Sequence, residues 1–230
     1  AYEIRLSLVG SEMCIRDRDG ATTVSSTMRI AKNNNIEVFS TGGIGGVHKQ
    51  AEQTFDISQD ILALSQVSML VVSSGAKSVL DLAKTLELLE TFGVSVVGFK
   101  TNDFPSFYSR SSGLGKINRI DSPKEIVEVF INNQLLELPC SILVSNPVPM
   151  EDEILPTKID SVIKKALVEL KKNQVSGKAV TPFLLDAIFK ETKGKSLKTN
   201  ISLALNNVKL GAKIAKELNT RTKRSGSKFQ

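Results

Sequence analysis

The stretch Val-Ser-Met-Leu-Val-Val-Ser-Ser-Gly-Ala-Lys, residues 67–77, decides the fold. Its apolar run is typical of a buried strand, and Ser-Ser-Gly ends that strand and leads into a helix over residues 78–92. Gly93 has the place of a helix C′ residue, and the apolar run 94–99 predicts a second strand. A strand–helix–strand unit with short joins indicates a parallel sheet. The helix has one apolar face, made of Val79, Leu82, Leu86 and Leu89.

Lys77 ends this stretch and is expected in the first turn of the helix. There it would lie beside unpaired backbone N–H groups and the positive end of the helix dipole. Such a place disfavours the charged ammonium form, and the uncharged amine is a nucleophile toward carbonyl groups. The alternative is an ordinary solvent-facing lysine, which this stretch taken alone favours.

The composition indicates a globular α/β protein of about one domain. Of the 230 residues, 41% are hydrophobic and 23% charged, and no apolar run is long enough to cross a bilayer. The net charge of +6 does not indicate a nucleic-acid partner, because aromatic residues, the usual stacking platforms, make up 5% of the chain. Cys14 and Cys140 form no metal or disulfide pattern, and no signal peptide is recognisable, so a cytoplasmic location is predicted.

The two ends of the chain differ from its middle. Residues 1–18 show neither strand alternation nor a helical face, and are interpreted as a foreign leader, with a short native strand as the alternative. Residues 221–230 are interpreted as a solvated basic tail. Residues 19–220 are expected to form the one folded domain.

Further strands and helices alternate along that domain. Strands are expected at 36–39 and 140–145, and residues 102–113 form a polar and aromatic loop. Ser122-Pro-Lys-Glu125 is a capping box with proline at the first helical position. The pattern as a whole predicts a three-layer α/β/α fold with a mostly parallel sheet. Helices are expected at 22–32, 61–65, 125–136, 160–172, 181–190 and 196–218.

A glycine loop, residues 40–48, follows the first strand. Four of the five residues at positions 42–46 are glycine. Its backbone can therefore approach a ligand closely and bind anions through N–H groups. The spacing of the glycines is not that of a dinucleotide site. Its last residue is His48, the only histidine, for which structural and functional roles are about equally plausible.

Two aspartates follow the glycine loop. Asp56 and Asp60 are four residues apart, and either Asp60 caps the next helix or one of the two binds a hard divalent cation. The last helix carries Asn200, Asn206 and Asn207, which are unusual in a packed helix. They either satisfy local backbone groups or bind a phosphate or sugar.

Seven segments, in this order, resemble the pseudouridine-5′-phosphate glycosidase family and cover roughly residues 20–218. They are Gly-Ala-Thr-Thr-Val (20–24), Phe-Ser-Thr-Gly-Gly-Ile-Gly-Gly-Val-His (39–48), Thr-Phe-Asp-Ile-Ser-Gln-Asp (54–60), Ser-Gly-Ala-Lys-Ser (74–78), Asn-Pro-Val-Pro (146–149), Thr-Pro-Phe-Leu-Leu (181–185) and Ser-Leu-Lys-Thr-Asn (196–200).

The resemblance implies an enzyme of pseudouridine catabolism. Such enzymes cleave the C–C glycosidic bond of pseudouridine 5′-phosphate reversibly to uracil and ribose 5-phosphate. They use a divalent cation, typically Mn²⁺, and resemble homotrimers of α/β/α subunits. By this resemblance Lys77 is the nucleophile that forms a Schiff-base-type adduct with the sugar, and Asp56 is the metal ligand. Substrate contacts are implied for Val24, Ser58, Gln59, Asp60, His48 and Asn200.

The chain departs from the family pattern in one important way. Family members carry, before the matched part, a general-acid glutamate in a segment such as Ala-Leu-Glu-Ser-Thr and a lysine that contacts substrate, and neither segment occurs here. We therefore expect a sheet that is incomplete at the N-terminus and a chain with little or no activity, because a general acid contributes about 10²–10⁴-fold to rate. Ser74 stands where the family has alanine, a small change.

Other functions remain open at this stage. One alternative is a different Schiff-base lyase or aldolase acting on a sugar phosphate, and another is a non-catalytic fragment or RNA-binding scaffold. Some relatives fuse this domain to a pseudouridine kinase, so residues 221–230 could also begin a linker.

Overall fold

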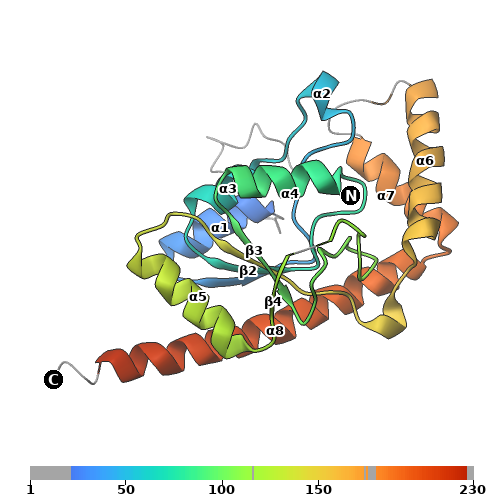
Figure 1. Cartoon of the computed structure of the whole chain (residues 1–230). Coiled ribbons are helices and arrows are strands. Elements are labelled where there is room, and N and C mark those ends of the chain that lie inside the picture. The colour runs from blue at the N-terminus through green and yellow to red at the C-terminus, as the bar shows by residue number, and fades with distance from the viewer. Residues whose placement is uncertain (1–21, 116, 174, 176–179, 227–230) are drawn as a thin grey trace, which may run out of the picture.

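The computed structural model describes residues 22–115, 117–173, 175 and 180–226 (Figure 1). The predicted leader, residues 1–18, lies outside them. No helix in this described part of the chain is both long and apolar enough to cross a membrane.

The described strands form one parallel five-stranded sheet, which confirms the predicted fold class. The last strand in sequence lies between the second and the third, because Ile142 is in register with both Leu70 and Ser95. The short fourth strand at the sheet edge was not predicted. In spatial order the strands are β1 (Val38–Ser40), β2 (Leu70–Ser73), β5 (Ile142–Ser145), β3 (Ser95–Phe99) and β4 (Asn118–Ile120).

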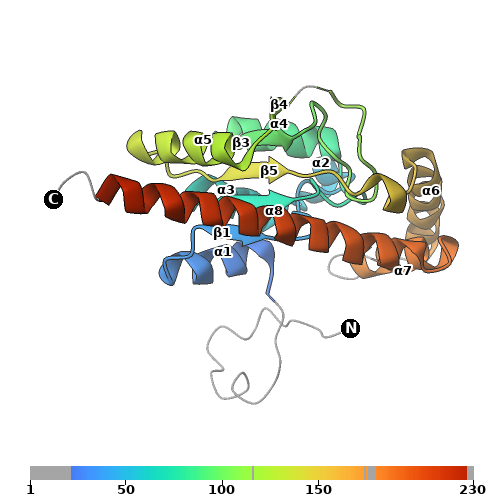
Figure 2. The same cartoon turned by 90° about the horizontal axis from the view of Figure 1, so that it is seen from below.

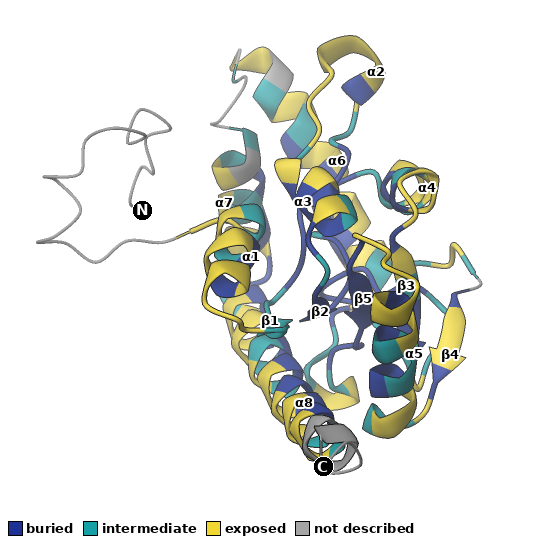
Figure 3. Ribbon diagram, turned by 90° about the vertical axis from the view of Figure 1, so that its left-hand side faces the viewer, coloured by how far each residue is buried: buried dark blue, intermediate teal, exposed yellow. Residues whose placement is uncertain are grey.

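Helices cover both faces of the sheet, because successive strand residues point to opposite sides. In β2, Leu70 and Val72 pack against α5 (Pro123–Leu135) and α8 (Lys195–Gly226). Between them, Val71 faces the opposite layer, formed by α1 (Val24–Asn33), α3 (Gln59–Gln66) and α4 (Leu82–Thr91). Figure 2 looks onto the face of the sheet that α5 and α8 cover, and Figure 3 shows β2 and β5 buried between helices with exposed outer surfaces. The three-layer α/β/α prediction is therefore confirmed.

Local sequence signals set several helix ends as expected. The Thr23 side chain caps α1 by accepting from Ser26 N, and Ser122 caps α5 by accepting from Glu125 N at 3.2 Å. Gly93 follows α4 with a φ of +71°, and its N–H donates to Glu90 O at 2.9 Å. Each of these ends depends only on residues a few positions apart, which is why the sequence predicts them.

The remaining helices lie around the carboxyl ends of the strands. Helices α6 (Pro156–Lys172) and α7 (Val180–Glu191) pack on each other and join the apolar core that also contains α1 and α3 (Figure 1). A short helix that was not predicted, α2 (Ala51–Thr54), follows the glycine loop, and a 3-10 turn, η3 (Met150–Asp152), follows β5. Helix α8 continues to Gly226, so the first residues of the predicted basic tail are helical.

Candidate active site

Two loops meet beyond the carboxyl ends of β1 and β2. They continue the pairing of the two strands, because Ser74 N donates to Gly42 O at 2.9 Å and Ile44 N donates to Gly75 O at 3.0 Å. Lys77 N then donates to Ile44 O at 3.2 Å. The glycine loop and the segment that carries Lys77 are thus fixed to each other by backbone hydrogen bonds.

The prediction that Lys77 lies in the first turn of a helix is wrong. Helix α4 begins at Leu82, with Asp81 as its N-cap. Lys77 precedes it in a separate turn, closed by a 3.0 Å bond from Leu80 N to Lys77 O. The turn forms because the backbone of Lys77 is still paired with the glycine loop and has no freedom to enter a helix. The helix-dipole argument for an activated lysine therefore does not apply.

A cavity of about 370 Å³ opens between these loops, and we call it the lysine cavity. Its lining comes from the start of α1, the glycine loop, the start of α3, the turn at Lys77 and α8. The fold thus brings together residues that lie more than a hundred positions apart in sequence. Predicted site residues in its lining are Val24, His48, Ser58, Asp60, Lys77 and Asn200.

Asp60 holds this cavity together rather than capping α3, the helix in which it lies. Its carboxylate is buried and accepts hydrogen bonds from Gly45 N at 2.8 Å and from Ser25 N at 2.9 Å. Ser58 is the N-cap of α3 and accepts from Asp60 N at 3.2 Å. The interpretation of Asp60 as the cap is therefore wrong, and as a metal ligand it would have to give up backbone donors that already use both of its oxygens.

Two predicted site residues lie outside the lining of the lysine cavity. The side chain of Asp56 is exposed, with its Oδ2 3.7 Å from His48 Nδ1. Gln59 borders a neighbouring hollow together with Ser25 and Arg29. Within the described residues no three His, Cys, Asp or Glu side chains gather as a metal site. The chemistry that remains at Asp56 suits a hydrated hard cation held by one carboxylate, not an ion enclosed by protein ligands.

Asn207, which the sequence marks only as unusual, joins the ends of three strands. Its Nδ2 donates to Thr41 O after β1 at 2.8 Å and to Ser74 Oγ after β2 at 3.1 Å. Its Oδ1 accepts from Asn146 Nδ2 after β5 at 3.0 Å. Because the side chain is fully buried, losing it would leave several polar groups without partners.

Sequence reasoning missed other residues in the lining of the lysine cavity. Thr41 and Phe107 both line it. The ring of Phe107 lies where a Cβ on Gly43 would be, and the backbone φ of Phe107 is +63°. The aromatic loop at 102–113 was the only signal for Phe107, and that signal does not say which side chain turns toward the glycine loop.

Comparison with known proteins identifies the family. Residues 9–217 match the family model described as indigoidine synthase A like protein. The pseudouridine-5′-phosphate glycosidase of Petrotoga mobilis is 48% identical over 201 residues, which are 87% of this chain and 66% of that protein. The chain belongs to the pseudouridine-5′-phosphate glycosidase family. The family member from Paracoccus denitrificans is 47% identical over 218 residues, 94% of this chain and 72% of that protein.

Solved structures of similar proteins agree with this assignment. The prealnumycin C-glycosynthase AlnA, in complex with ribulose 5-phosphate, superposes with a TM-score of 0.85 at 33% identity, covering 89% of this chain and 68% of that one. An indigoidine synthase A-like protein from Thermotoga maritima gives 0.78 at 42% identity, covering 85% and 64%. The chain thus spans about two thirds of the length of its relatives. The family match begins at residue 9, within the segment interpreted as a leader, whose foreign origin stays a prediction.

Proposed function

We propose that this domain cleaves the C–C glycosidic bond of pseudouridine 5′-phosphate to uracil and ribose 5-phosphate, reversibly, as a step of pseudouridine catabolism. The observation that supports this most is the half-buried Lys77 in a cavity whose wall is a glycine loop. An amine beside backbone N–H groups suits a substrate with a reactive sugar carbon and a phosphate. The names of the relatives support the same reaction.

A lysine adduct answers the chemical difficulty of this bond, which has no oxygen or nitrogen leaving atom to protonate. The Lys77 amine bonds to C1 of the sugar as the bond from C1 to the ring oxygen breaks. The nitrogen lone pair then forms C=N while the bond from C1 to uracil breaks, and that carbon of uracil takes up a proton. Water hydrolyses the iminium, which releases ribose 5-phosphate and restores the amine.

The other predicted residues receive supporting roles in this proposal. The glycine loop, His48 and Asn200 bind the phosphate end, and the backbone of Val24 contacts the substrate. Ser58 and Asp60 act through the start of α3, where Asp60 holds the Gly45 amide in place. Gln59, which faces a neighbouring hollow, contacts substrate only if its side chain turns.

Asp56 is proposed to hold a divalent cation, Mn²⁺ in the family pattern, with water as most of the remaining ligands. Bound there, the ion would balance the negative charge of the phosphate near His48. The 3.7 Å spacing between Asp56 and His48 leaves both side chains available to one small ion.

Further parts of the proposal concern the whole protein. We infer a cytoplasmic homotrimer without a nucleic-acid or membrane partner, and a fusion to a kinase domain is compatible with the family pattern. We also infer that these 230 residues by themselves turn over slowly, because the general-acid glutamate that the family resemblance implies is not among them.

A single-turnover experiment tests the proposed reaction despite slow turnover. The chain is incubated with pseudouridine 5′-phosphate, Mn²⁺ and cyanoborohydride, and trapped protein and free uracil are both quantified. Because each iminium forms as one C–C bond breaks, and water hydrolyses part of it before reduction, we expect at least one uracil for each trapped pentose adduct. With uridine 5′-phosphate as the control we expect neither product. An adduct from ribose 5-phosphate with none from pseudouridine 5′-phosphate would instead favour another Schiff-base lyase.

A further inference from the structure

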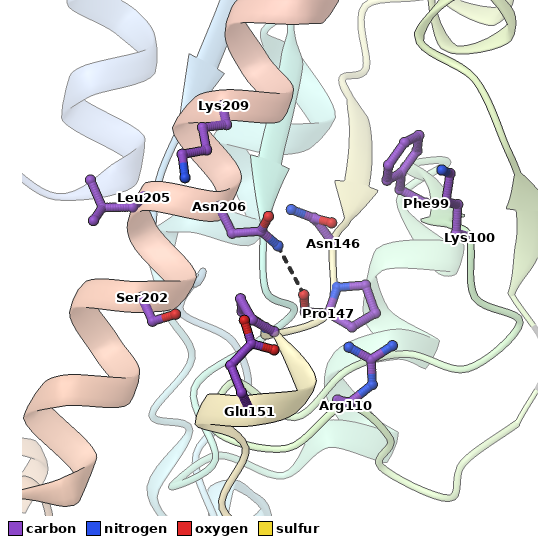
Figure 4. A pocket seen from close by; sticks show the side chains of 11 residues that line it. Phe99, Lys100, Arg110, Asn146, Pro147, Glu151, Ser202, Leu205, Asn206 and Lys209 are labelled. Atoms are coloured by element: carbon purple, nitrogen blue, oxygen red, sulfur yellow. Dashed lines mark hydrogen bonds between the residues drawn. The ribbon is translucent and has the colours of Figure 1, made fainter.

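A second cavity, of about 430 Å³, lies at the carboxyl ends of β3 and β5 (Figure 4). It is bounded on its other side by α8. We call it the basic cavity, because its lining contains the cationic side chains Lys100, Arg110 and Lys209. None of the residues to which the proposed reaction assigns a role lines it.

The charge of the basic cavity is unbalanced. Lys100, Arg110 and Lys209 come from three different segments, namely the end of β3, the loop after it and α8. Glu151 is the one carboxylate in the lining, so the lining residues carry a net charge of +2. Among the described residues no carboxylate forms an ion pair with any of the three cations. A dianion would balance this charge.

The backbone fixes the Arg110 side chain, whereas at Lys100 only the main chain is fixed. Lys100 has a φ of +57°, a region that non-glycine residues rarely adopt, and its N–H donates to Ile120 O at 2.9 Å. Arg110 Nη1 donates to Val148 O at 2.6 Å.

The other walls offer both hydrogen-bonding and apolar surface. Asn146 is buried and donates to Asn207, while its own Oδ1 accepts no hydrogen bond from any described residue. Figure 4 shows Arg110 and Lys209 on opposite sides of Asn146, and Lys100 beside Phe99. An acceptor between cations suits a ligand that carries hydroxyl donors as well as negative charge.

The basic cavity is distinct from the lysine cavity. The buried side chain of Asn207 lies between the two cavities. It is hydrogen-bonded to Ser74 after β2 and to Asn146 after β5. Along α8, Asn200 lines the lysine cavity, whereas Asn206 lines the basic cavity and donates to Pro147 O at 3.1 Å.

We propose that the basic cavity binds the phosphate group of a small phosphate monoester that also carries hydroxyl groups. Lys100, Arg110 and Lys209 bind the dianion, and Asn146 Oδ1 accepts from a hydroxyl group of the ligand. This site is independent of the proposed reaction at Lys77.

Binding of glycerol 3-phosphate tests the proposal, since this monoester has hydroxyl groups but no carbonyl with which Lys77 could react. Isothermal titration calorimetry on the whole chain compares the unchanged protein with Lys100→Gln/Lys209→Gln. The matched control is Lys164→Gln/Lys165→Gln, which removes two exposed lysines of α6. We expect the basic-cavity component of binding to weaken at least about tenfold in the cavity variant and to stay unchanged in the control, because charge-assisted hydrogen bonds are the strong ones. Any binding at the glycine loop should be the same in all three proteins.

A second measurement locates the ligand. In the unchanged protein, glycerol 3-phosphate should shift the side-chain amide NMR signals of Asn146 and Asn206, and these shifts should vanish in the cavity variant. Equal loss of binding in both double variants would mean non-specific attraction and would overturn the proposal. Shifts confined to the Thr41 and Gly42 amides of the lysine cavity would overturn it as well.

Discussion

The lysine cavity and the basic cavity lie side by side at the same edge of the sheet, yet they are built differently. The lysine cavity is lined in part by the glycine loop, which the buried side chain of Asp60 holds in place. The basic cavity is lined by long cationic side chains, of which Lys100 and Lys209 are exposed. Fixed geometry is what a covalent reaction requires, whereas long charged side chains are sufficient for binding an anion.

Asn207 is hydrogen-bonded to residues of both cavities, so its replacement should have the largest effect on stability. We expect Asn207→Leu to lower the free energy of unfolding by about 3–5 kcal/mol, because it leaves Thr41 O, Ser74 Oγ and Asn146 Nδ2 buried without their partner. Urea denaturation measures this. The neighbouring Asn206→Leu loses only the bond to Pro147 O and should cost less. Similar costs for the two variants would contradict the shared role.

Asp60 belongs to the lysine cavity alone, so its replacement should affect that cavity and leave the basic cavity unchanged. We expect Asp60→Asn to destabilise the fold by about 2–3 kcal/mol, because the amide cannot accept from both Gly45 N and Ser25 N. Hydrogen exchange at the Gly45 amide should become faster, and glycerol 3-phosphate binding to the basic cavity should stay the same. Unchanged exchange at Gly45 would show that the carboxylate does not hold the glycine loop.

Substitutions at two glycines compare the cost of steric crowding with the cost of backbone strain. A Cβ on Gly45 would collide with the Ser58 side chain, so Gly45→Ala should cost about 1–3 kcal/mol and disturb the lysine cavity. At Gly93 nothing lies within 4 Å and only the φ of +71° opposes a side chain, so Gly93→Ala should cost about 1 kcal/mol. Thermal or urea unfolding of both variants decides this, and a greater loss at Gly93 would refute the crowding at Gly45.

The smallest expected effect concerns Asp152, next to the basic cavity. Hydrogen bonds from Ser202 and then Lys198 lower the pKa of its carboxyl group below the ordinary value. A lowered folded-state pKa stabilises the protein above the unfolded-state pKa of about 3.9, and this contribution is lost as the pH falls through the folded-state value. The free energy of unfolding should therefore be larger for the unchanged protein than for Asp152→Asn at neutral pH, and the two values should converge in acid. A difference that persists in acid would show that the ionised carboxylate is not its cause.

The sequence predicts the local features of this fold well. The caps at Thr23 and Ser122 and the glycine end of α4 depend on neighbouring residues alone. Strand β4 was missed because Asn118–Ile120 is short and mostly polar, and its place depends on pairing with β3. Helix α2 has only four residues and left-handed backbone at both ends, so it has no periodic signal.

The two cavities also differ in how far the sequence predicts them. The family segments predicted most of the lysine cavity, because five of the seven contribute residues to its lining. The sequence Ser-Gly-Ala-Lys is typical of a helix start, but the backbone bond from Lys77 to Ile44 keeps Lys77 in a turn before the helix. No motif joins Lys100, Arg110 and Lys209, so only the folded chain brings these three together.

The central claim is that Lys77 is the reacting amine of the lysine cavity. Incubation of the chain with ribose 5-phosphate and cyanoborohydride, followed by peptide mass mapping, measures this directly. We predict one reduced pentose phosphate adduct on Lys77, none in Lys77→Arg, and an unchanged yield in Lys100→Gln/Lys209→Gln. Labelling of another lysine in place of Lys77, or an equal yield from Lys77→Arg, would contradict the account.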